Sequence, residues 1–295
     1  MKINKLKGCG TALVTPFKQD LEVDYDAFRA LVKRQIMAEI HFLVPLGTTG
    51  ETPCLEDDEK MELLRITNEE AKGKTPVVAG AGLNSTKQTI KNMEMLAKVG
   101  VDAFLVVTPY YNKPTQEGLY NHFKAIAEST DKPVIMYNVP GRTGVNMTVQ
   151  TCLKLAEINN IIGTKEASGN YAQISEIIRD APDDFIILSG NDDEVLSLMS
   201  TGAHGVISVA SNVAPEKMVS LVENLQAGSI TNGSSIHHRL ASLFRNCFIE
   251  SNPIPAKEAL SQLGLIENVL RPPLYKAQET TARLISETLK ELKLL

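Results

Sequence analysis

Short hydrophobic runs alternate with amphipathic segments over most of this chain. Each run is bounded by turn-forming residues such as Gly, Pro, Asn or Asp, a pattern typical of buried strands. The predicted strands cover residues 10–17, 41–47, 76–80, 102–110, 133–138, 160–165, 184–190 and 204–211. The sequence therefore predicts eight strands.

The segments between these runs have a helical period. Three of the predicted helices cover residues 24–39, 55–73 and 85–100. Asp24 and Ser85 are suited to cap the first and the third, because their side-chain oxygens can accept a hydrogen bond from the first turn. The second has acidic residues in its first turn and ends at Gly73, and both features favour a helix with these ends. One face of the first helix is apolar and carries Phe28, Leu31, Val32 and Ile36.

Strict alternation of strands and helices indicates a parallel sheet. A closed (β/α)8 barrel and an open doubly wound sheet both satisfy this pattern, and eight repeats without a break favour the barrel. Beyond residue 226 the pattern is helical only, over residues 237–265 and 277–295. We therefore expect an α/β chain with a catalytic (β/α)8 TIM barrel over residues 1–226 and a C-terminal helical extension over residues 227–295.

Composition and charge exclude several classes of protein. Of the 295 residues, 43% are hydrophobic and 22% are charged, which is ordinary for a globular protein. The net charge of −5 argues against nucleic acid as the main partner. No apolar run reaches about 18 residues and no signal peptide is recognisable, so we expect a cytoplasmic protein without a membrane span. The four cysteines lie far apart and predict reduced thiols, not a zinc cluster or a disulfide framework: Cys9, Cys54, Cys152 and Cys247.

Barrels of this type carry their chemistry at the carboxyl ends of the strands. The predicted strand ends supply hydroxyl groups, one arginine and one lysine: "GTTGE" at 47–51, Tyr110, Tyr111, Tyr137, Arg142, Lys165, Gly190, Ile207 and Ser208. None of these ends supplies a histidine or a carboxylate cluster with the spacing of a metal site. We therefore expect chemistry without a metal.

Lys165 ends an apolar run and is followed by small residues, "ASG". It is either a surface lysine whose ammonium reaches into water or a nucleophile that forms a Schiff base. At the ordinary lysine pKa of about 10.4, only roughly one lysine in 2,500 is neutral at pH 7. Burial in a barrel mouth disfavours the ammonium and would raise that fraction.

The neighbouring candidates have two interpretations each. Tyr137 is either core packing or a phenol that moves protons, in which case hydroxyls such as Thr48 and Tyr111 would have to relay the charge. "GTTGE" is either a simple turn or a turn whose backbone N–H groups bind an anion. Arg142 is either a surface charge or a guanidinium that binds both oxygens of a carboxylate. One lysine, a phenol relay and two anion sites favour class I aldol chemistry on a 2-oxo acid, without a cofactor.

Six motifs, in order and spread over nearly the whole chain, resemble the dihydrodipicolinate synthase family: "GTTGE", "PYYNKP", "YNVPGRTG", "IIGTKEASGN", "AHGVISV" and "NPIPAK". The superfamily also contains N-acetylneuraminate lyase. The resemblance implies condensation of pyruvate with L-aspartate 4-semialdehyde to give 4-hydroxy-tetrahydrodipicolinate, on the route to diaminopimelate and lysine. It also implies a homotetramer, a dimer of dimers.

The resemblance assigns a role to each site residue. Lys165 would form the Schiff base with pyruvate, whose carboxylate Thr49 would hold with help from the backbone of Ile207. Arg142 would hold the carboxylate of the second substrate. The remaining roles are a proton relay of Tyr137, Thr48 and Tyr111, with Tyr111 supplied by a neighbouring subunit, and a substrate contact at Gly190.

Two alternatives remain open. One is another pyruvate-dependent class I aldolase that cleaves a sugar acid such as N-acetylneuraminate; Arg142 and the Tyr110–Tyr111 pair argue against it. The other is a binding or regulatory protein that has lost catalysis; the presence of Lys165 and Tyr137 argues against that.

Feedback by lysine is predicted to be weak or absent. The positions that match the lysine cleft of sensitive family members are Thr52, Pro53, Asp57, Lys60, Asn84, Gln88 and Tyr110. Sensitive members carry a glutamate in place of Gln88, and commonly a histidine or glutamate in place of Lys60. A lysine ligand would therefore lose an anionic partner and meet an additional cation.

Overall fold

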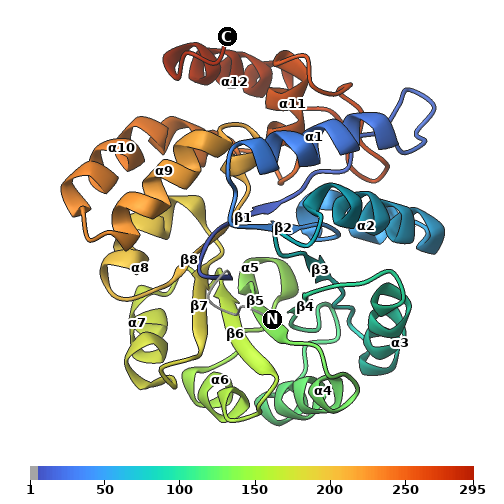
Figure 1. Cartoon of the computed structure of the whole chain (residues 1–295), viewed down its shortest axis with the longest axis vertical. Coiled ribbons are helices and arrows are strands. Elements are labelled where there is room, and N and C mark those ends of the chain that lie inside the picture. Colours follow the sequence, from blue (N-terminus) through green and yellow to red (C-terminus); the bar gives the residue numbers. More distant parts are fainter. Residues whose placement is uncertain (1–5) are drawn as a thin grey trace.

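The computed structural model describes residues 6–295, which form a ring of strands surrounded by helices (Figure 1). The strands are β1 Gly8–Ala12, β2 Phe42–Val44, β3 Val78–Gly80, β4 Ala103–Val107, β5 Val134–Asn138, β6 Ile161–Glu166, β7 Ile186–Ser189 and β8 Gly205–Ser208. They form one eight-stranded sheet in the order β2-β1-β8-β7-β6-β5-β4-β3, and every pairing between them is parallel.

The two end strands of this order, β2 and β3, meet and bring the sheet close to a full circle. Leu43 forms a parallel bridge with Val77. The Leu43 N–H donates to the Pro76 carbonyl at 2.9 Å, and the Gly80 N–H donates to the Pro45 carbonyl at 2.9 Å. The predicted TIM barrel is confirmed, and the open doubly wound sheet is excluded.

Apart from the short α5, which lies over the end of the ring, the helices lie around the strands (Figure 1). They are α1 Tyr25–Met37, α2 Asp57–Ala71, α3 Thr86–Ala97, α4 Gln116–Glu128, α5 Pro140–Thr143, α6 Val149–Ala156, α7 Tyr171–Asp180, α8 Val195–Ser200, α9 Pro215–Gln226, α10 Ile230–Asn246, α11 Ile254–Gln262 and α12 Glu279–Glu291. The predicted caps are confirmed: the Asp24 side chain accepts from the Ala27 N–H, and the Ser85 side chain from the Gln88 N–H.

Two apolar layers hold the barrel together. The inner layer fills the ring with side chains from most of the strands, among them Phe42, Leu105, Ile135, Leu188 and Ile207. Phe42 needs a glycine opposite it, because a Cβ on Gly10 would lie 2.1 Å from the Phe42 ring. The outer layer packs the other face of the sheet against the surrounding helices. The interior is therefore a packed core, open to chemistry only at its ends.

Some predicted boundaries were wrong. The first strand covers residues 8–12 instead of 10–17, because the chain leaves the barrel after Ala12 and Phe17 forms an antiparallel bridge with Val23. The sixth strand extends to Glu166, so Lys165 lies inside the strand and does not close it. The helix predicted over residues 237–265 is interrupted between α10 and α11, where Pro253 lacks the N–H that a continuous helix would use.

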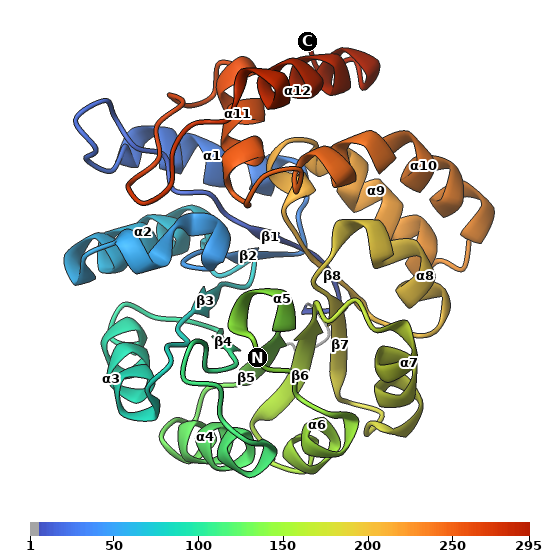
Figure 2. The ribbon, with the colours of Figure 1, turned by 180° about the vertical axis from the view of Figure 1, so that it is seen from behind.

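The helices after residue 226 pack against the barrel helices. α10 lies beside α9 and α8, and α12 packs against α10 and α11. α11 lies beside α1 (Figure 2). Leu260 of α11 shares a small buried cluster with Leu31 of α1. The expected division between barrel and extension falls at the end of α9, at Gln226.

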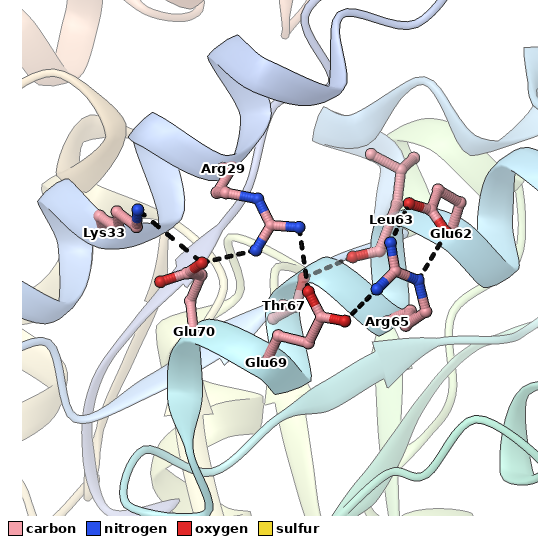
Figure 3. Close-up of polar contacts among 8 residues, drawn as sticks. All are labelled: Arg29, Lys33, Glu62, Leu63, Arg65, Thr67, Glu69 and Glu70. Carbon is pink, nitrogen blue, oxygen red and sulfur yellow. Dashed lines mark hydrogen bonds and ion pairs between the residues drawn. The ribbon is translucent and has the colours of Figure 1, made fainter.

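Ion pairs connect the outer surfaces of α1 and α2 (Figure 3). Arg29 contacts Glu70 at 2.5 Å and Glu69 at 2.9 Å, and Arg65 pairs with Glu62 and Glu69 on its own helix. These side chains are largely accessible to water, so each pair contributes little to stability, about 0–1 kcal/mol.

No helix within residues 6–295 is long and apolar enough to cross a membrane. All four cysteines are unpaired: Cys9, Cys152 and Cys247 are buried, and Cys54 is partly exposed.

Candidate active site

A cavity of about 560 Å³ opens among the carboxyl ends of the strands. It brings together all but one of the predicted site residues, namely Thr48, Thr49, Tyr137, Arg142, Lys165, Gly190 and Ile207. Tyr111 is the exception. It is 88% exposed and has a φ of 74°, and it is absent from the described residues that line the cavity. The strand ends therefore converge as the barrel argument requires.

Lys165 is buried, with 6% of its surface exposed. In β6 it pairs with Tyr137 of β5 on one side and with Leu188 of β7 on the other. Burial lowers its pKa to about 7; the nearby Asp192 raises the pKa and the Arg142 guanidinium lowers it. The surface-lysine interpretation is excluded. The neutral amine that a nucleophile requires is therefore far more populated near pH 7 than in an ordinary lysine.

Tyr137 presents its ring to this amine, with 4.1 Å between Lys165 Nζ and the ring centroid. Burial raises the pKa of its phenol to about 12, and the Arg142 guanidinium lowers it in part. A phenol with this pKa keeps its proton at neutral pH. It is therefore equipped to donate a proton, and it acts as a base only if another group removes the charge.

The "GTTGE" segment forms a compact double turn after β2. Thr48–Gly50 and Thr52–Cys54 are short 3-10 helices, joined by Glu51 in the left-handed region. The N–H groups of Gly50 and Glu51 donate inside the turn, to the carbonyls of Gly47 and Thr48. An anion at this turn would therefore be met by the N–H groups and hydroxyls of Thr48 and Thr49.

Arg142 lies on the short helix α5, directly after β5. Its Nη2 donates to the carbonyl oxygen of Asn252 at 3.2 Å. The side chain is exposed at the mouth of the cavity. A guanidinium placed here can hold a carboxylate that enters from the solvent side.

Two residues of the site were missed by the sequence analysis. Asn252 lines the cavity, and its Nδ2 donates to Thr49 Oγ1 at 3.0 Å. Asp192 is fully buried behind Lys165, and its Oδ2 accepts from the N–H groups of Val209 and Ala210 at 3.0 and 2.9 Å. Burial raises the Asp192 pKa, while hydrogen bonds from the end of β8 and the charge of Lys165 lower it.

The sequence did contain a signal for each of them. Asp192 directly follows a strand end, but the search for carboxylates asked for clusters with metal spacing and passed over a single acid. Asn252 lies in "NPIPAK", within a segment predicted to be a continuous helix. Among residues 6–295, no group of three or more His, Cys, Asp or Glu side chains is arranged to hold a metal ion.

Comparison with known proteins agrees with this arrangement. Residues 5–292 match the Dihydrodipicolinate synthetase family. The chain belongs to this family. The resemblance inferred from the six motifs is thereby confirmed, and family membership makes the chain an enzyme, a lyase.

Individual relatives are similar over their whole length. The 4-hydroxy-tetrahydrodipicolinate synthase of Thermotoga neapolitana is 47% identical over 293 residues, which is 98% of this chain and 99% of the relative. The crystal structure of dihydrodipicolinate synthase from Thermotoga maritima superposes with a TM-score of 0.96 at 46% identity, covering 98% of this chain and 99% of that one. A structure described as the first monomeric dihydrodipicolinate synthase variant superposes with a TM-score of 0.97 at 45% identity, covering 99% of both chains.

Proposed function

We propose that this enzyme condenses pyruvate with L-aspartate 4-semialdehyde to give 4-hydroxy-tetrahydrodipicolinate, a step toward diaminopimelate and lysine. The observation that carries the proposal is the buried Lys165 amine beside the Tyr137 ring, in a cavity that is also lined by the anion-binding turn and by Arg142. Two anion sites suit two substrates that each carry a carboxylate. A substrate with a single carboxylate and a polyol chain, such as a sugar acid, would not require Arg142.

The first step forms an imine. Lys165 Nζ attacks the ketone carbon of pyruvate, and the carbinolamine loses water as the oxygen is protonated. Tyr137, whose ring faces Nζ, is the residue that we propose as the donor. The pyruvate carboxylate rests on Thr48 and Thr49, with help from the backbone of Ile207 in β8, which is separated from β2 by β1 alone.

The second step forms the carbon–carbon bond. The imine loses a methyl proton and becomes an enamine, whose terminal carbon attacks the aldehyde carbon of the second substrate. The aldehyde oxygen takes up a proton and becomes the hydroxyl of the product, while Arg142 holds the substrate carboxylate. Gly190 would contact this second substrate from the loop after β7.

The last step releases the enzyme. The amino group of the second substrate attacks the imine carbon, closes the six-membered ring and displaces Lys165 as a free amine. Because Lys165 supplies the covalent chemistry, the proposed cycle needs neither a metal nor a cofactor. It uses small metabolites only, and we place it in the cytoplasm, without a nucleic acid or membrane partner.

Protons would travel through Tyr137, Thr48 and Tyr111. Tyr111 is exposed in the single chain and holds a backbone conformation that is uncommon for a tyrosine, so we propose that it completes the site of a neighbouring subunit in a homotetramer. Mixing inactive Tyr111→Phe and Lys165→Ala variants tests this. Hybrid oligomers should regain activity if Tyr111 acts across the interface, and should stay inactive if it acts within its own chain.

Reductive trapping tests the function itself. Borohydride added with pyruvate should give a covalent adduct that peptide mapping places on Lys165. Lys257 is an internal control, since it is also buried with a pKa lowered to about 8, but it pairs with Glu51 and does not line the cavity. An adduct on Lys257, or none, would contradict the proposal. Condensation with aspartate semialdehyde, assayed beside cleavage of N-acetylneuraminate, separates the two aldolase functions.

A further inference from the structure

We propose that the C-terminal extension positions the anion-binding turn of the barrel through a buried ion pair between Lys257 and Glu51. This inference rests on the proposed function, in which Thr48 and Thr49 hold the pyruvate carboxylate. It makes Lys257 and Glu51 positioning residues, which act on the substrate through the turn and do not touch it.

The turn does not hold its shape by local backbone preference alone. Leu46 and Glu51, which flank Thr48 and Thr49, have φ values of 62° and 54°. Residues with a Cβ seldom adopt this left-handed conformation, and they keep it only where surrounding contacts enforce it. Hydrogen bonds inside the turn, such as that from the Glu51 N–H to the Thr48 carbonyl, are supplemented by contacts from outside it.

The first of these contacts is the ion pair. Lys257 Nζ lies 2.7 Å from Glu51 Oε1, and both side chains are fully buried. Glu51 Oε2 accepts the backbone N–H of Arg271 at 3.0 Å. A buried pair is costly unless its remaining hydrogen-bonding groups are satisfied, and here both carboxylate oxygens have a partner.

Lys257 also reaches the other side of the turn. Its Nζ donates to the Thr15 carbonyl at 2.8 Å, and the Thr15 hydroxyl donates to the Gly50 carbonyl at 2.7 Å. The ammonium lies 4.3 Å from the centroid of the Phe17 ring. One charged group thus ties the segment after β1 and the turn after β2 to helix α11.

Arg271 holds the downstream end of the turn. Its Nη1 donates to the Cys54 carbonyl at 2.8 Å, and its guanidinium binds both oxygens of Glu59 at 2.6 and 2.5 Å. The same guanidinium lies 4.6 Å from the Phe17 ring. The Thr49 hydroxyl itself accepts from Asn252, so three residues of the extension contact the segment from Thr49 to Cys54.

The reactive amine is positioned independently of this network. Lys165 lies within β6 between two paired strands, whereas the turn depends on contacts from residues far along the chain. Breaking the Lys257–Glu51 pair should therefore weaken capture of the pyruvate carboxylate. It should leave the rate of imine trapping at saturating pyruvate nearly unchanged, because that rate depends on Lys165. Use of the aldehyde is no independent reference, since Arg142 donates to the Asn252 carbonyl of the same extension.

Three variants test this: Lys257→Met, Glu51→Gln and the double variant, each assayed below its unfolding temperature as judged by circular dichroism. The pyruvate concentration for half-maximal imine trapping should rise about tenfold or more in Lys257→Met, because one unpaired buried charge remains. The double variant, which buries no charge at this position, should recover part of that loss. The rate of imine trapping at saturating pyruvate should change less than about twofold, because Lys165 is held by its strand neighbours and not by this network.

Leu289→Ala is the matched control for loss of stability. Leu289 is fully buried in α12 of the same extension and makes no contact with the turn among the interactions of the described residues. The pyruvate concentration for half-maximal imine trapping in Leu289→Ala should match that of the unaltered enzyme. If Leu289→Ala shifts the pyruvate response as much as Lys257→Met does, the effect is general destabilisation and the inference is wrong.

Thr49→Val separates failure of the inference from failure of the function. If Thr49→Val leaves pyruvate half-saturation unchanged, the carboxylate site is not at this turn and the proposed function loses its first anion site. If Thr49→Val raises half-saturation but folded Lys257→Met and Glu51→Gln do not, the function stands and the positioning role is overturned. Should Lys257→Met fail to fold, Glu51→Gln alone tests the positioning role, because it keeps the size of the side chain.

Discussion

The Nζ atom of Lys165 lies 4.1 Å from the centre of the Tyr137 ring, across the paired strands β5 and β6. An aromatic face attracts an ammonium, by about 0.5–2 kcal/mol, yet the pKa of Lys165 is lowered to about 7 because burial has the larger effect. Near neutral pH the pair therefore combines a readily deprotonated amine with a protonated phenol. Nucleophile and proton donor are both in the state that imine formation requires.

Tyr137→Phe keeps this ring and removes the hydroxyl. We expect kcat for condensation to fall about 10²–10⁴-fold, the usual contribution of a positioned proton donor. Borohydride should still trap pyruvate on Lys165, but more slowly, because the same phenol would donate the proton in imine formation. Tyr120→Phe is the matched control, since Lys154 lies 4.1 Å from that ring outside the cavity. Equal losses in the two variants would show that the Tyr137 hydroxyl has no chemical role.

Lys165→Met is expected to stabilise the protein near neutral pH. The Lys165 pKa is about 7 when folded and ordinary, about 10.4, when unfolded. Below pH 7 the folded enzyme therefore bears the full cost of a buried charge, on the order of a few kcal/mol. As the pH rises from 7 to about 10.4, only the unfolded state binds the proton, so the wild-type enzyme gains stability.

The stability gap between Lys165→Met and the wild type should therefore be largest below pH 7 and should narrow toward pH 10. Denaturant unfolding measured across this range checks it. Lys154→Met, at an exposed position, should show no such trend. A gap that stays constant with pH would mean that Lys165 does not have a lowered pKa.

Gly190→Ala should slow imine formation without removing the nucleophile. A Cβ on Gly190 would lie 3.1 Å from Lys165 Cε and 2.6 Å from Ala167 Cβ, so the lysine side chain would have to move. Misplacement of a reacting group by about 1 Å can cost roughly 10²-fold in rate, and we expect a loss of about 10–10²-fold in single-turnover trapping. Gly141→Ala, where a Cβ would meet nothing within 4 Å, should react at the normal rate.

Arg142→Ala should mainly affect the aldehyde substrate. Loss of a charge-assisted hydrogen bond costs about 1.5–3 kcal/mol, which corresponds to a rise of roughly 10–150-fold in KM for aspartate semialdehyde. Arg142→Lys keeps the positive charge but lacks the planar guanidinium that binds both oxygens of a carboxylate. Its KM for aspartate semialdehyde should lie between those of the wild type and of Arg142→Ala. Steady-state kinetics with each substrate varied in turn measures this. A collapse of pyruvate affinity with normal use of the aldehyde would reverse the assignment.

Lysine at concentrations below about 1 mM should not inhibit the condensation by half. Lys60 lines the cavity and pairs with Asp57 at 3.0 Å, while Gln88 is exposed and uncharged. If each departure weakens a lysine ligand by about 1 kcal/mol, a screened fraction of the Coulomb energy at about 4 Å, affinity falls by roughly 30-fold. Half-inhibition below about 1 mM, a concentration typical of metabolites, would contradict this. The double variant Lys60→Glu, Gln88→Glu should gain sensitivity.

The sequence by itself determined the alternation of strands and helices in the barrel. It also identified seven of the residues that line the cavity. Strand and helix periods, and caps such as Asp24 and Ser85, are local properties of ten to twenty residues, because they depend on side-chain spacing and on the first turn of each helix. Parallel strands then bring their carboxyl ends together whatever lies between them. Lys165, Tyr137 and Arg142 could therefore be placed at one face from the sequence.

Only the tertiary structure decided what those residues can do. The local sequence around Lys165 is compatible with a solvated ammonium and with a buried amine, and closure of the barrel around it lowers its pKa. Glu51 and Lys257 are 206 residues apart and Thr49 and Asn252 are 203 apart. No local pattern connects such pairs, because burial and long-range contacts arise only when the extension packs onto the closed barrel.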